Sequence, residues 1–143
     1  MSKDKDIESL LSGAKDARAA GHAAEARRGY EQAAKQARVI GDNRLLAHAL
    51  RHISDINRED GRPAEALESG REAVELYRAL PGALPVDLAN ALRITGLAQQ
   101  DLGEVGEASS LWHEARNLYV QAGIKAGVEE CDVNLSRIGS RGR

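Results

Sequence analysis

Residues 58–66 read REDGRPAEA, and variants of this stretch occur twice more along the chain. The other copies are RAAGHAAEA at residues 18–26 and QDLGEVGEA at residues 100–108. Their shared glycines, Gly21, Gly61 and Gly103, are separated by 40 and 42 residues. Self-similarity at a nearly fixed spacing of this size indicates an architecture built from stacked repeats.

Further columns of similar residues keep the same register from each glycine. Glutamate and alanine follow it by four and five residues, a second alanine comes seven residues later, a leucine lies eleven residues before it, and a small residue seven before it. The members are Glu25, Glu65, Glu107; Ala26, Ala66, Ala108; Ala33, Ala73, Ala115; Leu10, Leu50, Leu92; and Ala14, Ser54, Gly96. So many aligned columns in three copies are not expected by chance.

The spacing of apolar residues predicts two helices per repeat with the glycine at the turn. Glycine just past a helix adopts the left-handed conformation that satisfies the last carbonyl groups. Pro63 suits the first turn of the next helix, where its missing N–H costs little. Alanine at positions such as Ala26 and Ala66 lets antiparallel helices approach closely.

We therefore predict an all-α, single-domain chain of about seven antiparallel helices. The expected helices span residues 5–20, 23–40, 44–60, 63–80, 86–102, 105–122 and 125–138. The repeats span about 5–40, 44–80 and 86–122, followed by a capping helix at 125–138 with one polar face. We expect the tail at 139–143 to be disordered.

Composition excludes several other classes. The chain has 143 residues, 3% aromatic residues, no Phe, three Pro and 29% charged residues, which disfavours β-sandwiches, disorder and membrane spans. A formal charge of −2 offers no general attraction to nucleic acid or anionic membranes. The single Cys excludes an intramolecular disulfide framework. The opening MSKDKDIESLLSG lacks the apolar core of a secretory signal, so the expected compartment is the cytoplasm.

These residues resemble the tetratricopeptide-repeat family. The resemblance rests on the small residues before each turn, the Glu-Ala pairs, the aromatic position at Tyr30 and Trp112, and the second alanine column, and it covers roughly residues 5–122. Gly70 departs from it by replacing the aromatic residue. The usual period is about 34 residues. The longer unit here is similar to that of kinesin light chains and some bacterial regulators.

The resemblance implies a right-handed α-solenoid whose first helices line a concave, peptide-binding groove. Registering each helix on its turn glycine places eight polar residues on that surface, five of them cationic. They are Lys15, Arg18, His48, Arg51, Asp55, Arg58, Asn90 and Arg93. Such a bias favours an acidic peptide or protein segment, with arginine making bidentate contacts.

Two alternatives stay open at this point. The charged surface could be a solvated face whose charges pair along one helix, for example Asp55 with Arg51 or Arg58. The module could also be a self-associating scaffold, a homodimer formed through an end of the solenoid, because three repeats are near the minimum for a continuous core. The chain would then be a homodimer and not a monomer.

The remaining candidate residues indicate neither catalysis nor a cofactor. His48, His52 and Asp55 are spaced for one helix face, but no general-base glutamate lies between the histidines, so we assign no metal site. The sequence contains no phosphate-binding glycine loop and no nucleophile motif. We expect Cys131 to be a buried apolar residue. We also expect the aromatic residues of the second helices to fill space between helix pairs, namely Tyr30, Tyr77, Trp112 and Tyr119.

Overall fold

The computed structural model describes residues 3–141 of the backbone and the side chains of residues 6–139. Within this range the chain forms seven α-helices and no strand, as predicted. The helices are α1 (Lys3–Ala19), α2 (Ala23–Ile40), α3 (Asn43–Glu59), α4 (Pro63–Ala79), α5 (Pro85–Asp101), α6 (Val105–Ala122) and α7 (Lys125–Arg141). Six of the seven agree with the predicted ranges to within two residues at each end.

The seventh helix is longer than predicted. Helix α7 continues through Gly139 to Arg141, so the first three residues of the tail that we expected to be disordered are helical. The last two residues of that predicted tail, 142–143, lie outside the described residues.

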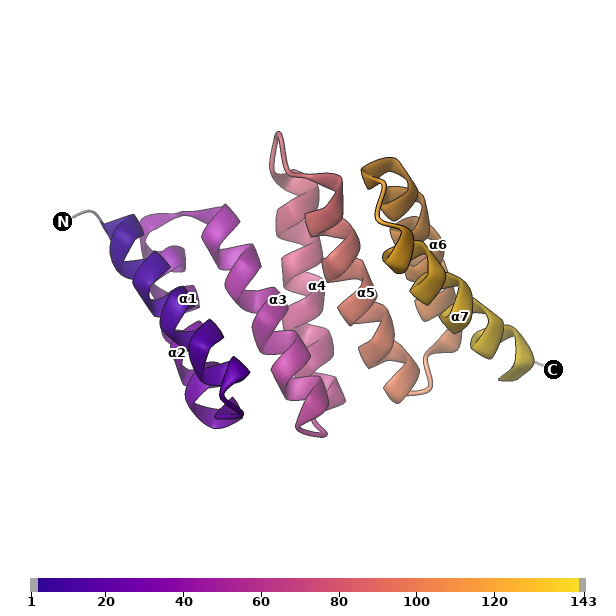
Figure 1. The fold of residues 1–143 in the computed structure, drawn as a ribbon, viewed down its shortest axis with the longest axis horizontal. Coiled ribbons are helices and arrows are strands. Elements are labelled where there is room, and N and C mark those ends of the chain that lie inside the picture. Colours follow the sequence, from indigo (N-terminus) through magenta and orange to yellow (C-terminus); the bar gives the residue numbers. More distant parts are fainter. Residues whose placement is uncertain (1–2, 142–143) are drawn as a thin grey trace.

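The helices form two layers, and each helix packs against the next one in the chain (Figure 1). Helices α1, α3, α5 and α7 form the layer that faces the viewer, and α2, α4 and α6 lie behind it. We call the outer surface of the first layer the front face. None of the described helices is long and apolar enough to cross a membrane.

The turns inside the repeats depend on glycine. Gly21, Gly61 and Gly103 have φ angles of 84°, 76° and 80°, in the left-handed region that other residues rarely adopt. Between repeats, the Asp42 carboxylate accepts a hydrogen bond from the Leu45 N–H at 3.0 Å and caps α3. Pro63 and Pro85 occupy first-turn positions of α4 and α5.

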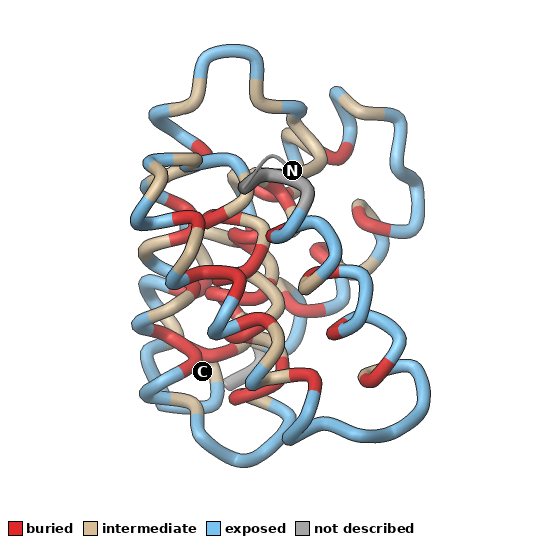
Figure 2. The backbone as a smooth tube through the Cα atoms, turned by 90° about the vertical axis from the view of Figure 1, so that its left-hand side faces the viewer, coloured by how far each residue is buried: buried red, intermediate tan, exposed pale blue. Residues whose placement is uncertain are grey.

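Small residues make the contacts between the layers. All six alanines of the two recurring columns are fully buried: Ala26, Ala33, Ala66, Ala73, Ala108 and Ala115. Figure 2 shows the buried turns gathered between the layers and the exposed turns outside them. An alanine at such a point fills the available space without separating the two helices.

The aromatic residues and the cysteine lie where the sequence predicted. Tyr30, Tyr77, Trp112 and Tyr119 are all buried in the core. Cys131 on α7 is also buried, and burial raises the pKa of its thiol to about 11. The thiol therefore stays protonated near neutral pH.

Gly70 stands where the other two repeats have an aromatic residue, and side chains of α5 and α3 lie close to it. A Cβ atom at Gly70 would lie 2.5 Å from the Thr95 hydroxyl oxygen and 3.1 Å from that of Ser54. Thr95 Oγ1 is itself fixed, because it donates to the Ala91 carbonyl at 2.7 Å. The close approach of α4 to α5 thus requires glycine here.

Replacing Gly70 by alanine should therefore destabilise the protein by about 1–3 kcal/mol, because the new methyl group overpacks the α4–α5 contact. Gly13 is the matched control, since it is also helical but a Cβ there would meet nothing within 4 Å. Gly13→Ala should stabilise the protein by up to about 1 kcal/mol through helix propensity. Urea denaturation measures both; equal effects of the two variants would contradict this packing.

Candidate functional site

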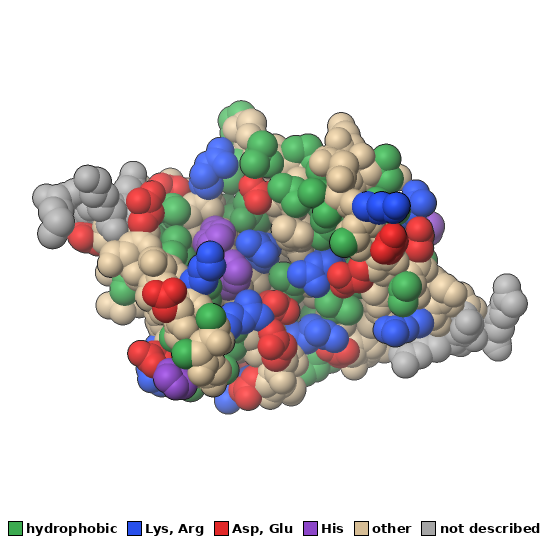
Figure 3. All heavy atoms as spheres, in the orientation of Figure 1, with side chains coloured by type: hydrophobic (Ala, Val, Ile, Leu, Met, Phe, Trp, Pro, Cys, Tyr) green, Lys and Arg blue, Asp and Glu red, His purple; other side chains and the backbone are tan. Residues whose placement is uncertain are grey.

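The eight residues predicted for the groove lie on the three helices expected to carry them. Helix α1 holds two of them, α3 four and α5 two: Lys15 and Arg18; His48, Arg51, Asp55 and Arg58; Asn90 and Arg93. Figure 3 shows this face of the molecule, where cationic and acidic side chains alternate across the front face and two histidines lie together at its left.

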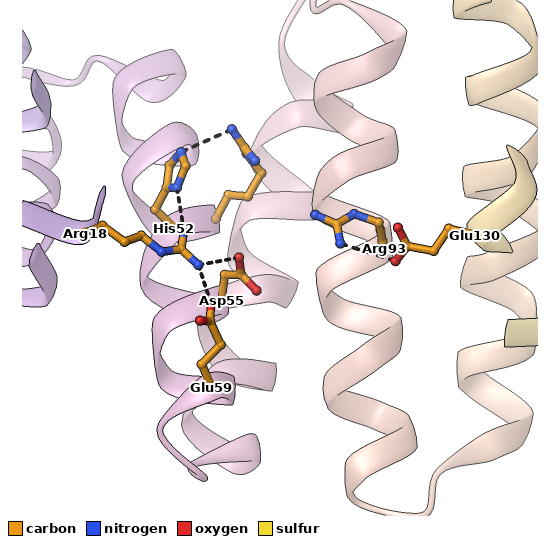
Figure 4. A network of polar contacts seen from close by, with 7 residues as sticks. Arg18, His52, Asp55, Glu59, Arg93 and Glu130 are labelled. Carbon is orange, nitrogen blue, oxygen red and sulfur yellow. Dashed lines mark hydrogen bonds and ion pairs between the residues drawn. The ribbon is translucent and has the colours of Figure 1, made fainter. Parts of the chain in front are cut away.

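Arg18 is neutralised by the neighbouring helix. Its guanidinium donates to the Asp55 carboxylate at 2.6 Å and also to the Glu59 carboxylate, both on α3 (Figure 4). Asp55 therefore pairs with a cation of α1, and not with Arg51 or Arg58 of its own helix. The pairing expected within one helix is replaced here by pairing between helices.

Two further arginines are paired in the same way. Arg58 Nε lies 2.9 Å from an Asp101 carboxylate oxygen on α5. Arg93 donates to the Glu130 carboxylate on α7 at 3.3 Å. The pairing acids Glu59, Asp101 and Glu130 were not predicted from the sequence. Glu59 and Asp101 nevertheless occupy equivalent positions in their repeats, because each stands two residues before its turn glycine.

Only part of the front face therefore retains unpaired positive charge. Among the described residues, Lys15 and Arg51 form no ion pair with a carboxylate. Both line a pocket of about 500 Å³ between α1 and α3, which we call the α1–α3 pocket. Its lining residues are Leu11, Ser12, Lys15, Tyr30, His48, Arg51 and His52.

Two histidines in contact with each other line the α1–α3 pocket. The His52 ring lies parallel to the Tyr30 ring at a centroid distance of 4.7 Å, and His48 meets His52 edge-on at 4.7 Å. Burial, followed by the charge of Arg51, lowers the pKa of both histidines, and that of His52 falls to about 3. His52 is therefore neutral at physiological pH, and the charge of the pocket comes from Lys15 and Arg51.

Arg51 is the less satisfied of these two cations. Its Nη2 lies 3.2 Å from His52 Nε2, and its Nε is buried with no hydrogen-bond partner in the part of the chain described. A buried donor without an acceptor costs free energy.

The comparison with known families agrees with the fold. The family model described as tetratricopeptide repeat matches residues 10–79, which include the whole α1–α3 pocket. Residues 10–79 therefore belong to the tetratricopeptide-repeat family. No curated protein matches its sequence. Tetratricopeptide repeats are generally protein–protein interaction modules.

Asn90, the remaining groove residue of this tetratricopeptide domain, is fixed by a tyrosine of the second layer. The Tyr119 hydroxyl donates to Asn90 Oδ1 at 2.6 Å. Because the carbonyl end of the amide is engaged, its N–H groups are the end available to a ligand on the front face.

Two of the three residues weighed as metal ligands, His52 and Asp55, are engaged with arginines. His52 faces Arg18 as well as Arg51, and Asp55 is held by Arg18. Within the described range, no three His, Cys, Asp or Glu side chains lie together as metal ligands would.

The burial of His52 predicts an acid sensitivity of the tetratricopeptide fold. Between pH 6.5 and 3 the unfolded chain takes up a proton at His52 while the folded chain does not, so stability falls as the pH falls. The contribution is at most about 1.4 kcal/mol per pH unit. Thermal or urea unfolding at pH 7.5, 6, 5 and 4 should show a shallower decline for His52→Gln than for the wild type. Parallel curves would refute a depressed pKa.

The pairing of Arg93 with Glu130 predicts a measurable coupling. A double-mutant cycle with Arg93→Gln and Glu130→Gln should give a coupling of about 0.5–1 kcal/mol in urea unfolding, typical of a partly exposed ion pair. A coupling of zero would mean that the Arg93 guanidinium is free for a ligand, contrary to the geometry.

Proposed function

We propose that this domain binds an acidic segment of a partner protein on its front face, with the α1–α3 pocket as the principal contact. The family supports the general role of protein binding. The unpaired charge of Lys15 and Arg51 at one pocket supports the acidic chemistry of the ligand.

The single observation that carries this proposal is the difference between Arg51 and the other arginines of the front face. Arg18, Arg58 and Arg93 each have a carboxylate of the neighbouring helix within 3.3 Å. Binding an acidic ligand at any of them would require breaking an existing ion pair. At Arg51 the ligand carboxylate displaces no carboxylate, because the contacts of Arg51 are with the neutral imidazole of His52 and with Tyr77.

We infer that the domain acts by binding and without catalysis. In the described part of the chain, His48 and His52 make no hydrogen bond to a hydroxyl or thiol that either could activate as a nucleophile. The Cys131 thiol is buried on α7, with its pKa raised. The polar groups of the α1–α3 pocket are suited to binding a charged ligand.

We also infer that the domain acts as a monomer. The residues that α1 exposes are mostly polar, and its apolar residues Ile7 and Leu11 are buried within the fold. The first helix thus leaves little apolar area for a second copy to cover. Light scattering over a wide range of concentrations should give the mass of one chain.

The charge of Arg51 is tested by reversing it. Arg51→Glu should abolish binding to an array of acidic peptides, with a loss of at least about tenfold in affinity, because a repelling carboxylate replaces the attracting guanidinium. Fluorescence anisotropy with the best peptide of the array measures the loss. The same peptides with lysine in place of their acidic residues should not bind the wild type.

Arg28→Glu is the matched control, because Arg28 is exposed on α2 outside the pocket and its reversal changes the net charge equally. Circular dichroism and thermal melting check that both variants fold. Equal losses in the two variants would show that overall charge, and not the α1–α3 pocket, attracts the peptide.

A further inference from the structure

His52 lies between two guanidinium groups. Arg18 Nη1 lies 3.3 Å from one ring nitrogen, Nδ1, and Arg51 Nη2 lies 3.2 Å from the other, Nε2 (Figure 4). The ring is also fixed by its stacking on Tyr30. It therefore cannot turn away from either arginine without losing that contact.

These two contacts cannot both be hydrogen bonds. An arginine only donates, and a neutral imidazole has one nitrogen that accepts and one that carries a proton. A protonated imidazole would accept from neither arginine. One of the two guanidinium groups therefore meets an N–H group of His52 and has no acceptor there.

The surroundings of the two arginines decide which one needs the acceptor. Arg18 has the carboxylates of Asp55 and Glu59. Arg51 has no carboxylate partner among the described residues, and its Nε is buried without an acceptor. The lowest free energy of the empty pocket thus places the lone pair of His52 on Nε2, toward Arg51, and the proton on Nδ1.

We propose that Arg51 binds an oxyanion, a carboxylate or a phosphate group, in the α1–α3 pocket, and that His52 is its positioning residue and exchanges its tautomer when the anion binds. The proposal extends the proposed function. It rests on that function for the assumption that the anion belongs to a partner protein.

The tautomer exchange follows from the hydrogen-bond acceptors that the anion brings to Arg51. An oxyanion offers several lone pairs to the Nη groups of Arg51, which then no longer depends on His52. The proton of the ring can move, through solvent, from Nδ1 to Nε2. Nδ1 then accepts from Arg18. The Arg51 guanidinium turns from Nε2 toward the anion, which leaves the new Nε2–H free to donate to the anion. The net protonation of the ring is unchanged.

Nuclear magnetic resonance of the full chain, labelled with ¹⁵N in its histidines, tests the exchange directly. Inorganic phosphate is titrated at constant ionic strength, with sodium chloride as the reference salt, and glutarate serves as a carboxylate probe. The ¹⁵N shifts of His52 should begin with Nδ1 protonated and exchange their assignments saturably as either anion binds. Comparing the two affinities distinguishes a phosphate from a carboxylate source.

Two variants separate the pocket from general screening. Arg51→Gln should abolish the saturable change, and Arg28→Gln should retain it. His52→Gln should weaken anion binding by about tenfold, since it loses the ring that positions Arg51. If His52 had only a structural role, its tautomer would not change when the anion binds.

Three results would overturn the proposal: no saturable binding of either anion, an anion-bound His52 whose tautomer is unchanged, or an equal response in Arg51→Gln. The proposed function fails separately. If the tautomer responds but acidic peptides bind Arg51→Glu as tightly as the wild type, the anion site remains and the peptide site lies elsewhere. If Arg51→Glu loses the acidic peptide but the His52 tautomer of the wild type does not respond to the anion, only the inference about His52 fails.

Discussion

The close approach of successive helices is the constraint on which the rest of this structure depends. It is met by buried alanines such as Ala26 and Ala66, and by Gly70 where even a methyl group would collide with Thr95. A core with so few aromatic residues obtains its stability from many short contacts at high packing density. The same closeness brings side chains of neighbouring first helices within reach of one another and so creates the charge arrangement of the front face.

That arrangement has a consistent direction. On the front face, an arginine of one helix pairs with an acid of the next first helix along the chain, as in Arg18 with Asp55. The second layer follows the same rule, with Arg38 of α2 bound to Glu72 of α4 at 2.7 Å and Arg78 of α4 to Glu114 of α6 at 2.5 Å. Each exposed pair contributes little stability alone. Together they link each repeat to the next in one register, and Lys15 and Arg51 of the α1–α3 pocket stand outside this pairing.

The sequence predicted the fold far better than the charge of the front face. Helix ranges follow from periodicity and turn residues, which are local, and six of seven were found within two residues. The positions of Lys15, Arg51 and Arg93 on the first helices also follow from register. Their pairing does not, because Glu130 lies 37 residues from Arg93 and reaches it only through the stacking of α5 and α7. The stacking of His52 on Tyr30 is likewise a property of the packed helices.

The ion pairs of the second layer use the same two positions of each repeat, and two of these positions carry uncharged residues. Gln32 stands in the first repeat where Glu72 and Glu114 stand in the others, and Val120 stands in the third where Arg38 and Arg78 stand. This row of ion pairs therefore runs from Arg38 on α2 to Glu114 on α6 within the described residues. The uncharged side chains of Gln32 and Val120 thus leave α2 without this acid and α6 without this arginine, so each of these two helices takes part in the row through one charge and α4 through two.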